Sequence, residues 1–87
     1  MYLKVGDLVE QTKVYVVGDF QDELVKQTLK EVKESLEERG YDPVNQIVGY
    51  LISGDPGYIS SYKEARTKIS RLDRTKIIEV LVRDSVK

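Results

Sequence analysis

Residues 41–56 read YDPVNQIVGYLISGDP, and this stretch fixes where the middle of the chain turns. Asp42 is a typical N-cap, and Pro43 suits the first helical position because it needs no hydrogen-bond partner for a backbone N–H. Gly54 predicts the end of this helix, and the Asp55-Pro56 pair repeats the same start signal. The helix carries apolar residues around much of its circumference, so we expect it at the centre of the fold: Val44, Ile47, Val48, Leu51 and Ile52.

Three residues inside this helix are unusual. Gly49 costs about 1 kcal/mol relative to alanine in a helix, which indicates that another backbone approaches closely. Asn45 and Gln46 lie in the first turn, where we expect them to cap the helix or to cross-link neighbouring segments. Direct ligand binding by this pair is the alternative. Asp42 and Asp55 are interpreted as caps and not as catalytic carboxylates.

Further helices are predicted on both sides. Residues 20–39 form an apolar stripe, with Asp19 as N-cap and Gly40 as the stop: Phe20, Leu24, Val25, Leu29, Val32 and Leu36. Residues 61–64 read as a capping box that opens a third helix through Leu72, in which Ala65, Ile69 and Leu72 face inward. Asp73 caps a fourth helix, in which Glu79 and Arg83 pair on the outside and the apolar stripe is Ile77, Ile78, Leu81 and Val82. The predicted class is therefore all-α, with four to five short helices in a compact body of residues 19–87.

Residues 1–18 are expected to form a separate N-terminal arm. The stretch 8–17, LVEQTKVYVV, has strand-like composition, but nothing later in the chain resembles a partner strand. A lone strand cannot satisfy its backbone hydrogen bonds. We therefore expect an extended or flexible arm, or one that is ordered only against a second subunit.

The composition of the 87 residues limits the possible chemistry. One domain fits this length, and its core must be thin. The sequence has neither cysteine nor histidine. It therefore lacks the usual zinc ligand sets and the common base for nucleophilic catalysis. We predict no enzymatic activity, no metal and no cofactor. No apolar run approaches the roughly 20 residues of a membrane span, and the N-terminus does not resemble a signal peptide, so we expect a cytoplasmic protein.

The charge is polarised along the chain. Residues 1–59 hold six basic and eleven acidic side chains, and residues 60–87 hold eight basic and four acidic ones, which gives −5 and +4. Such polarity suits an anionic partner or self-association, and ordinary solvated helix faces are the equal alternative. The segment 43–72 also resembles a helix-turn-helix that binds nucleic acid. The net charge of −1 and the scarcity of Asn and Gln in its second helix argue against that function.

Tyrosines gather around the two Asp-Pro corners, at positions 41, 50, 58 and 62. Tyrosine is favoured at protein interfaces because it offers contact area and a polar tip. These rings either close a small core or form an interaction surface. The predicted structural and interface residues are Tyr41, Pro43, Asn45, Gln46, Gly49, Tyr50, Gly54, Asp55, Pro56 and Tyr58.

The stretch GYDPVNQIVGYLISGDPGYISSYKEAR, with RTKIIEVLVRD after it, closely resembles the bacterial IreB family. The pattern G-Y-x-P-x-N-Q-I-V-G-Y-x-x-S-G-D-P-x-Y-I runs from Gly40 to Ile59, and the likeness extends from about Thr12 to Asp84. The resemblance implies a small cytoplasmic helical homodimer without known catalytic residues. It also implies a substrate of a membrane-bound Ser/Thr kinase with PASTA repeats, reversed by a partner phosphatase, in cell-wall stress and antibiotic-resistance signalling.

The family's phosphoacceptors are two N-terminal threonines spaced three residues apart. On this chain one position falls on Thr12, and the other falls on Val9, which cannot accept phosphate. Phosphorylation is therefore expected at one site at most. A phosphate on Thr12 would add about −1.5 to −2 charges. We expect Arg66, Arg71 or Arg74 to bind that anion.

Overall fold

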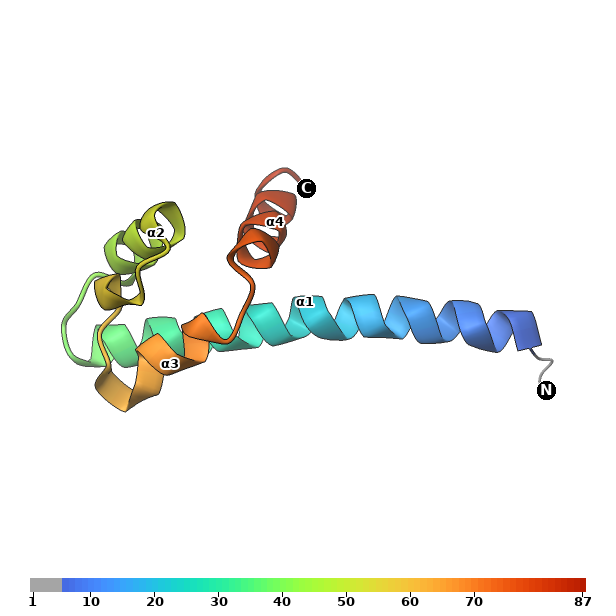
Figure 1. The fold of residues 1–87 in the computed structure, drawn as a ribbon, viewed down its shortest axis with the longest axis horizontal. Coiled ribbons are helices and arrows are strands. Elements are labelled where there is room, and N and C mark those ends of the chain that lie inside the picture. The colour runs from blue at the N-terminus through green and yellow to red at the C-terminus, as the bar shows by residue number, and fades with distance from the viewer. Residues whose placement is uncertain (1–5) are drawn as a thin grey trace.

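A computed structural model describes the backbone of residues 6–87 and the side chains of residues 20–87. Over these residues the chain has four α-helices and two short 3-10 helices, and no strand. In chain order they are α1 (Gly6–Glu38), α2 (Pro43–Ser53), η1 (Pro56–Tyr58), η2 (Tyr62–Glu64), α3 (Ala65–Ser70) and α4 (Arg74–Ser85). The all-α prediction is confirmed (Figure 1).

Helix α1 is much longer than the sequence pattern predicted. It begins at Gly6, thirteen residues before the predicted N-cap Asp19, and the molecule measures 52 Å along its longest axis. The strand-like interpretation of residues 8–17 is wrong, because their backbone is helical. Extending an existing helix adds one hydrogen bond per residue without a new nucleus. Valine and tyrosine favour strands only where a neighbouring strand supplies packing, and none is present among the described residues.

Helices α2, α3 and α4 all pack against the C-terminal half of α1 (Figure 1). Gly40 adopts the left-handed conformation with φ of +79°, which reverses the chain after α1 as predicted. The N-terminal part of α1 projects away from this body. The core draws residues from every α-helix: Val25, Val32, Leu36, Tyr50, Ile59, Ala65, Ile69, Ile77 and Val80.

The prediction that α2 lies at the centre is wrong. Only Tyr50 of this helix is buried, and Ile47 and Leu51 are partly covered. Val48 remains 46% exposed and Ile52 80% exposed. The long helix α1 occupies the centre instead, because its length lets three helices pack along one element. The outer apolar face of α2 has no cover within the described part of the chain.

The predicted capping box at residues 61–64 is also wrong. Ser61 forms no side-chain cap, and the backbone passes through η2 before α3, which has only six residues. Lys63 and Glu64 have φ of 51° and 62°, a left-handed conformation that costs a non-glycine residue about 1–2 kcal/mol. The inward positions Ala65 and Ile69 are nevertheless buried as expected.

Helix α4 follows the prediction more closely. Asp73 caps it by accepting a hydrogen bond from the Thr75 N–H at 2.9 Å. The predicted Glu79–Arg83 pair forms at 3.3 Å. Ile77 is buried, but the other members of the predicted stripe stay exposed: Ile78, Leu81 and Val82.

Candidate functional site

The two Asp-Pro corners have the capping geometry that the sequence predicted. The Asp42 carboxylate accepts a hydrogen bond from the Asn45 N–H at 3.2 Å, with Pro43 at the helix start. The Asp55 carboxylate accepts one from the Gly57 N–H at 2.8 Å, although it caps a 3-10 helix and not an α-helix. Both carboxylates therefore hold backbone at corners.

Gly49 is packed against a side chain, whereas the sequence had indicated a neighbouring backbone. A Cβ atom built there would lie 2.6 Å from Cδ1 of Tyr58 and 3.2 Å from Cγ of that ring. Real Cβ atoms essentially never come that close. The glycine therefore lets the ring of Tyr58, which follows the second Asp-Pro corner, pack closely against α2. Even so, Tyr58 remains 54% exposed.

Gln46 cross-links two segments, as predicted. Its Oε1 accepts a hydrogen bond from the Ser60 N–H at 3.0 Å and so ties α2 to the loop after η1. The neighbouring Asn45 is exposed and contributes its backbone N–H to the cap. Tyr50 is a core residue, while Tyr41 is exposed. The tyrosines thus divide between core and surface.

The three arginines predicted to bind an anion lie at different places. The Arg66 Nε donates to the carbonyl of Ile59 at 2.8 Å. The Arg74 Nη1 donates to the carbonyl of Leu51 at 2.9 Å, and its guanidinium covers Gly54, which has φ of +76°. Arg71 is exposed. Two of the three therefore already hold backbone carbonyls, and anion binding by this set stays a prediction.

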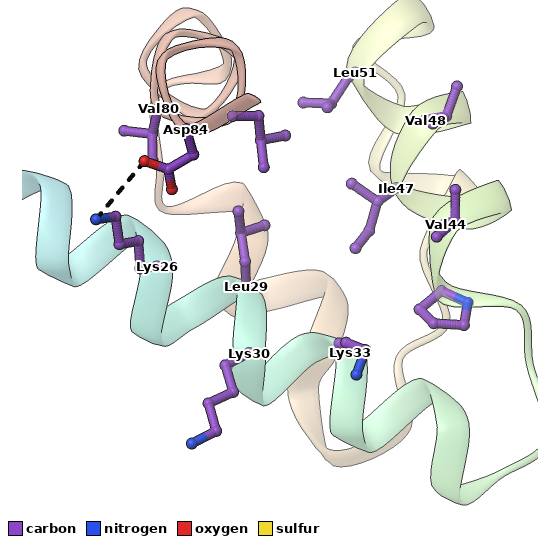
Figure 2. A pocket seen from close by; sticks show the side chains of 12 residues that line it. Lys26, Leu29, Lys30, Lys33, Val44, Ile47, Val48, Leu51, Val80 and Asp84 are labelled. Carbon is purple, nitrogen blue, oxygen red and sulfur yellow. Dashed lines mark ion pairs between the residues drawn. The ribbon is translucent and has the colours of Figure 1, made fainter. Parts of the chain in front are cut away.

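An open groove is a surface feature that sequence reasoning missed. It encloses about 440 Å³ between α1, α2 and α4 (Figure 2). Its walls are mainly apolar, with Leu29 from α1, Ile47 and Leu51 from α2, and Val80 and Leu81 from α4. Three lysines from α1 line the same groove: Lys26, Lys30 and Lys33. Their spacing of four and three residues was visible in the sequence, but the facing helices were not.

The groove lysines form only long ion pairs or none with acidic side chains of residues 20–87. Lys26 lies 3.9 Å from Asp84 on α4, the contact drawn in Figure 2, and 3.9 Å from Glu23. Lys33 lies 3.7 Å from Glu37. These distances are near the limit for ion pairs, and exposed pairs of this kind contribute little. Lys30 forms no ion pair with a side chain in the described range 20–87.

A charge cluster joins α4 to α1 beside the groove. The Asp22 carboxylate lies 2.6 Å from Arg83 Nη1 and 3.3 Å from Lys76 Nζ. Loss of water around Asp22 favours the protonated acid, but the hydrogen bonds and charges of the two cations prevail and lower the pKa of Asp22 below its ordinary value. The same partnership raises the pKa of Lys76. This cluster fixes the position of the α4 wall.

A second group of polar contacts, between Glu38, Lys63 and Tyr62, holds η2 against the end of α1. The Lys63 Nζ lies 2.8 Å from the Glu38 carboxylate, and the Tyr62 hydroxyl donates to the same carboxylate at 3.2 Å. The Lys63 hydrogen bond lowers the pKa of Glu38, and the same bond raises the pKa of Lys63. Arg39 also stacks on the Tyr62 ring, 4.8 Å from its centroid. These contacts stabilise the left-handed backbone at residues 63 and 64.

The described residues bear on two further features, a metal site and a membrane span. Among them, no cluster of three or more acidic side chains is arranged to hold a metal ion. None of the helices that the structure describes combines the length and apolar character needed to cross a bilayer. The helix-turn-helix alternative is not favoured, because α3 is short and Lys68 is paired with Glu31 at 3.5 Å.

The chain matches a known protein family over most of its length. Residues 10–87 fit the family model described as IreB regulatory phosphoprotein. The matched range includes Thr12, all of α2 to α4 and the groove between them.

Proposed function

The chain belongs to the IreB regulatory phosphoprotein family, and we propose that it is a cytoplasmic, non-enzymatic regulator that works as a homodimer. A bacterial Ser/Thr kinase would phosphorylate Thr12, and a phosphatase would remove the phosphate. Cell-wall stress and antibiotic resistance are the signalling context that the family resemblance suggests. The protein would act through contacts with partners and not through a reaction of its own.

The observation that carries this proposal is the apolar surface left open around the groove. Val44 and Val48 on α2 and Leu81 on α4 line this groove and are each at least 40% exposed. Monomeric proteins rarely expose contiguous apolar patches of this kind unless the patch binds something. A second copy would cover it and add the stability that a thin core lacks.

Thr12 suits a regulatory switch because of where it lies. It falls within the part of α1 that projects beyond the body (Figure 1). Valine at position 9 leaves Thr12 as the one acceptor among the two positions that the family comparison suggests. A Ser/Thr kinase therefore has a single family phosphoacceptor position, Thr12, to modify in this segment of the helix.

Two measurements test the proposal. Sedimentation at high micromolar concentration is expected to show a dimer, and a stably folded 10-kDa particle would overturn dimerisation. Incubation with a matching PASTA-type kinase is expected to place phosphate on Thr12, as mapped by mass spectrometry. Thr12→Ala should abolish the modification, whereas Thr28→Ala on the same helix is the matched control and should not. Unchanged phosphate incorporation in Thr12→Ala would refute the assignment.

A further inference from the structure

We propose that the groove between α2 and α4 is the docking site for residues 6–17 of α1 from a second copy of the chain. This inference rests on the proposed homodimer and specifies which surfaces meet. Each copy would insert its projecting helix segment into the groove of the other. Thr12 would then lie inside the interface, so that one position joins modification to assembly.

The groove has the properties of a site for an amphipathic helix. Figure 2 shows Leu29 of α1 between Ile47 and Leu51 of α2 on one side and Val80 of α4 on the other, and Leu81 of α4 also lines the groove. The apolar surface continues past the groove onto exposed Val44 and Val48. An extended apolar channel between helices fits a helical segment, which anchors through residues at spacings of three and four.

The projecting segment supplies such a helix. Its backbone is helical from Gly6, and Figure 1 shows it running away from the body. In the sequence, positions 8, 9, 12, 15 and 16 share one helix face, and they hold Leu, Val, Thr, Tyr and Val. Twelve helical residues span about 18 Å, and α2, with eleven, spans about 16 Å. The segment and the groove wall therefore match in length.

Charge favours the same pairing. Residues 6–17 contain Asp7 and Glu10 against a single lysine, so the segment is acidic. The groove presents Lys26, Lys30 and Lys33 from α1. Lys30 has no ion-pair partner within residues 20–87, and the other two are held only at 3.7–3.9 Å. An incoming acidic helix would compete for Lys26 and Lys33, whose present ion pairs are long, and could also pair with Lys30, which points away from α2 and α4 in Figure 2 and would have to turn toward it.

The occupant must come from another molecule. Residues 6–17 continue the same helix that carries Lys26, and that helix has no break between Gly6 and Glu38. The segment therefore points away from its own groove and cannot fold back into it while α1 stays intact. In a two-fold dimer the contact would occur twice, once in each groove.

The absence of cysteine from the chain allows a direct test with the full-length protein. A tagged chain with Val16→Cys is mixed with an untagged chain carrying Val44→Cys, Val48→Cys or Leu81→Cys, all at exposed groove positions. We expect a mixed disulfide between the two chains on mild oxidation. The matched control is Glu34→Cys, an exposed position on α1 that does not line the groove. It should give at least tenfold less mixed product.

The outcomes separate this inference from the proposed dimer. If sedimentation shows a dimer but none of the three groove cysteines exceeds the Glu34→Cys control, the groove assignment is overturned and the dimer stands. If the protein sediments as a monomer, both are overturned. Preferential groove cross-linking that is lost in Thr12→Glu, with the circular dichroism spectrum unchanged, would in addition place Thr12 in the contact.

Discussion

Replacing Gly49 with alanine should reveal whether the Tyr58 ring is what forbids a side chain on this face of α2. The added Cβ would lie 2.6 Å from Cδ1 and 3.2 Å from Cγ of that ring. Ordinary carbon contacts are about 3.5–4.0 Å, so the ring must move by roughly 1 Å. Cδ1 must move most and Cγ by only a few tenths of an ångström, so the ring must shift away from its present packing against α2.

Two opposing terms set the size of the effect. Alanine is better than glycine in a helix by about 1 kcal/mol. Forcing an extra carbon into a packed contact costs about 1–3 kcal/mol. With a cost of about 2 kcal/mol, near the middle of that range, the net destabilisation is about 1 kcal/mol. For a domain of this size, that lowers Tm by about 4–8 °C.

The same substitution should change sign once the ring is absent. In a Tyr58→Ala background, Gly49→Ala removes no contact and should raise stability by about 1 kcal/mol through helix propensity alone. Urea and thermal unfolding followed by circular dichroism, at one fixed protein concentration, give the four corners of this double-mutant cycle. If Gly49→Ala raised Tm equally in both backgrounds, the Tyr58 contact would not be the reason for glycine at this position.

Three further substitutions test other contacts. Gln46→Leu leaves the part-buried Ser60 N–H without its acceptor and should cost about 1–2 kcal/mol in urea unfolding, whereas Asn45→Leu at the exposed neighbouring position should cost much less. Asp22→Asn should lower Tm near neutral pH. The pKa of Asp22 is lowered in the folded state, so the Asp22 charge stabilises the fold above the ordinary pKa of 3.8. This stabilisation is lost as the pH falls below that value. A Tm deficit that persists unchanged in acid would contradict the role of the Asp22 charge. Glu64→Gly removes the strain of a φ of 62° and should be neutral or stabilising by about 0.5 kcal/mol. Thr67→Gly in α3 should destabilise the protein by about 1 kcal/mol. If both variants lowered Tm equally in thermal unfolding, residue 64 would not be strained.

Local signals in the sequence were sufficient for the helix boundaries that depend on neighbouring residues alone. The caps at Asp42 and Asp73 and the left-handed stops at Gly40 and Gly54 form as predicted. Each needs only a side chain within three residues or a single dihedral angle, so a short pattern contains all the required information.

The wrong predictions share a different cause. Ser61 and Glu64 match a capping box, but Lys63 and Tyr62 bind Glu38, which lies more than 20 residues earlier. That tertiary contact decides the backbone at η2, and no local pattern reports it. The start of α1 was missed for a related reason, since composition suggested a strand while the adjoining helix offered a lower-cost way to satisfy the backbone.

The candidate groove could not be predicted at all from single segments. No pattern in the sequence distinguishes its lysines, and most of its apolar residues belong to the predicted apolar stripes of α1, α2 and α4. Only their arrangement around one open space shows that several predicted core residues are left without cover. The outer face of α2 is apolar, as its sequence predicted. The sequence did not indicate that α1, and not α2, lies at the centre and leaves this face uncovered.

Uncovered apolar surface has a consequence for how such a regulator responds to modification. Among residues 20–87 the buried core contains few side chains, while Val44, Val48 and Leu81 stay open to water. If a second copy covers these residues as proposed, folding and assembly draw on the same apolar area, and Tm must rise with protein concentration. Thr12 shares the apolar face of its segment, so a charge introduced there would be buried against apolar groove walls and would weaken assembly and lower Tm together. If Tm did not depend on protein concentration over a hundredfold range, folding would not be coupled to assembly, and the apolar surface would be open for a different partner.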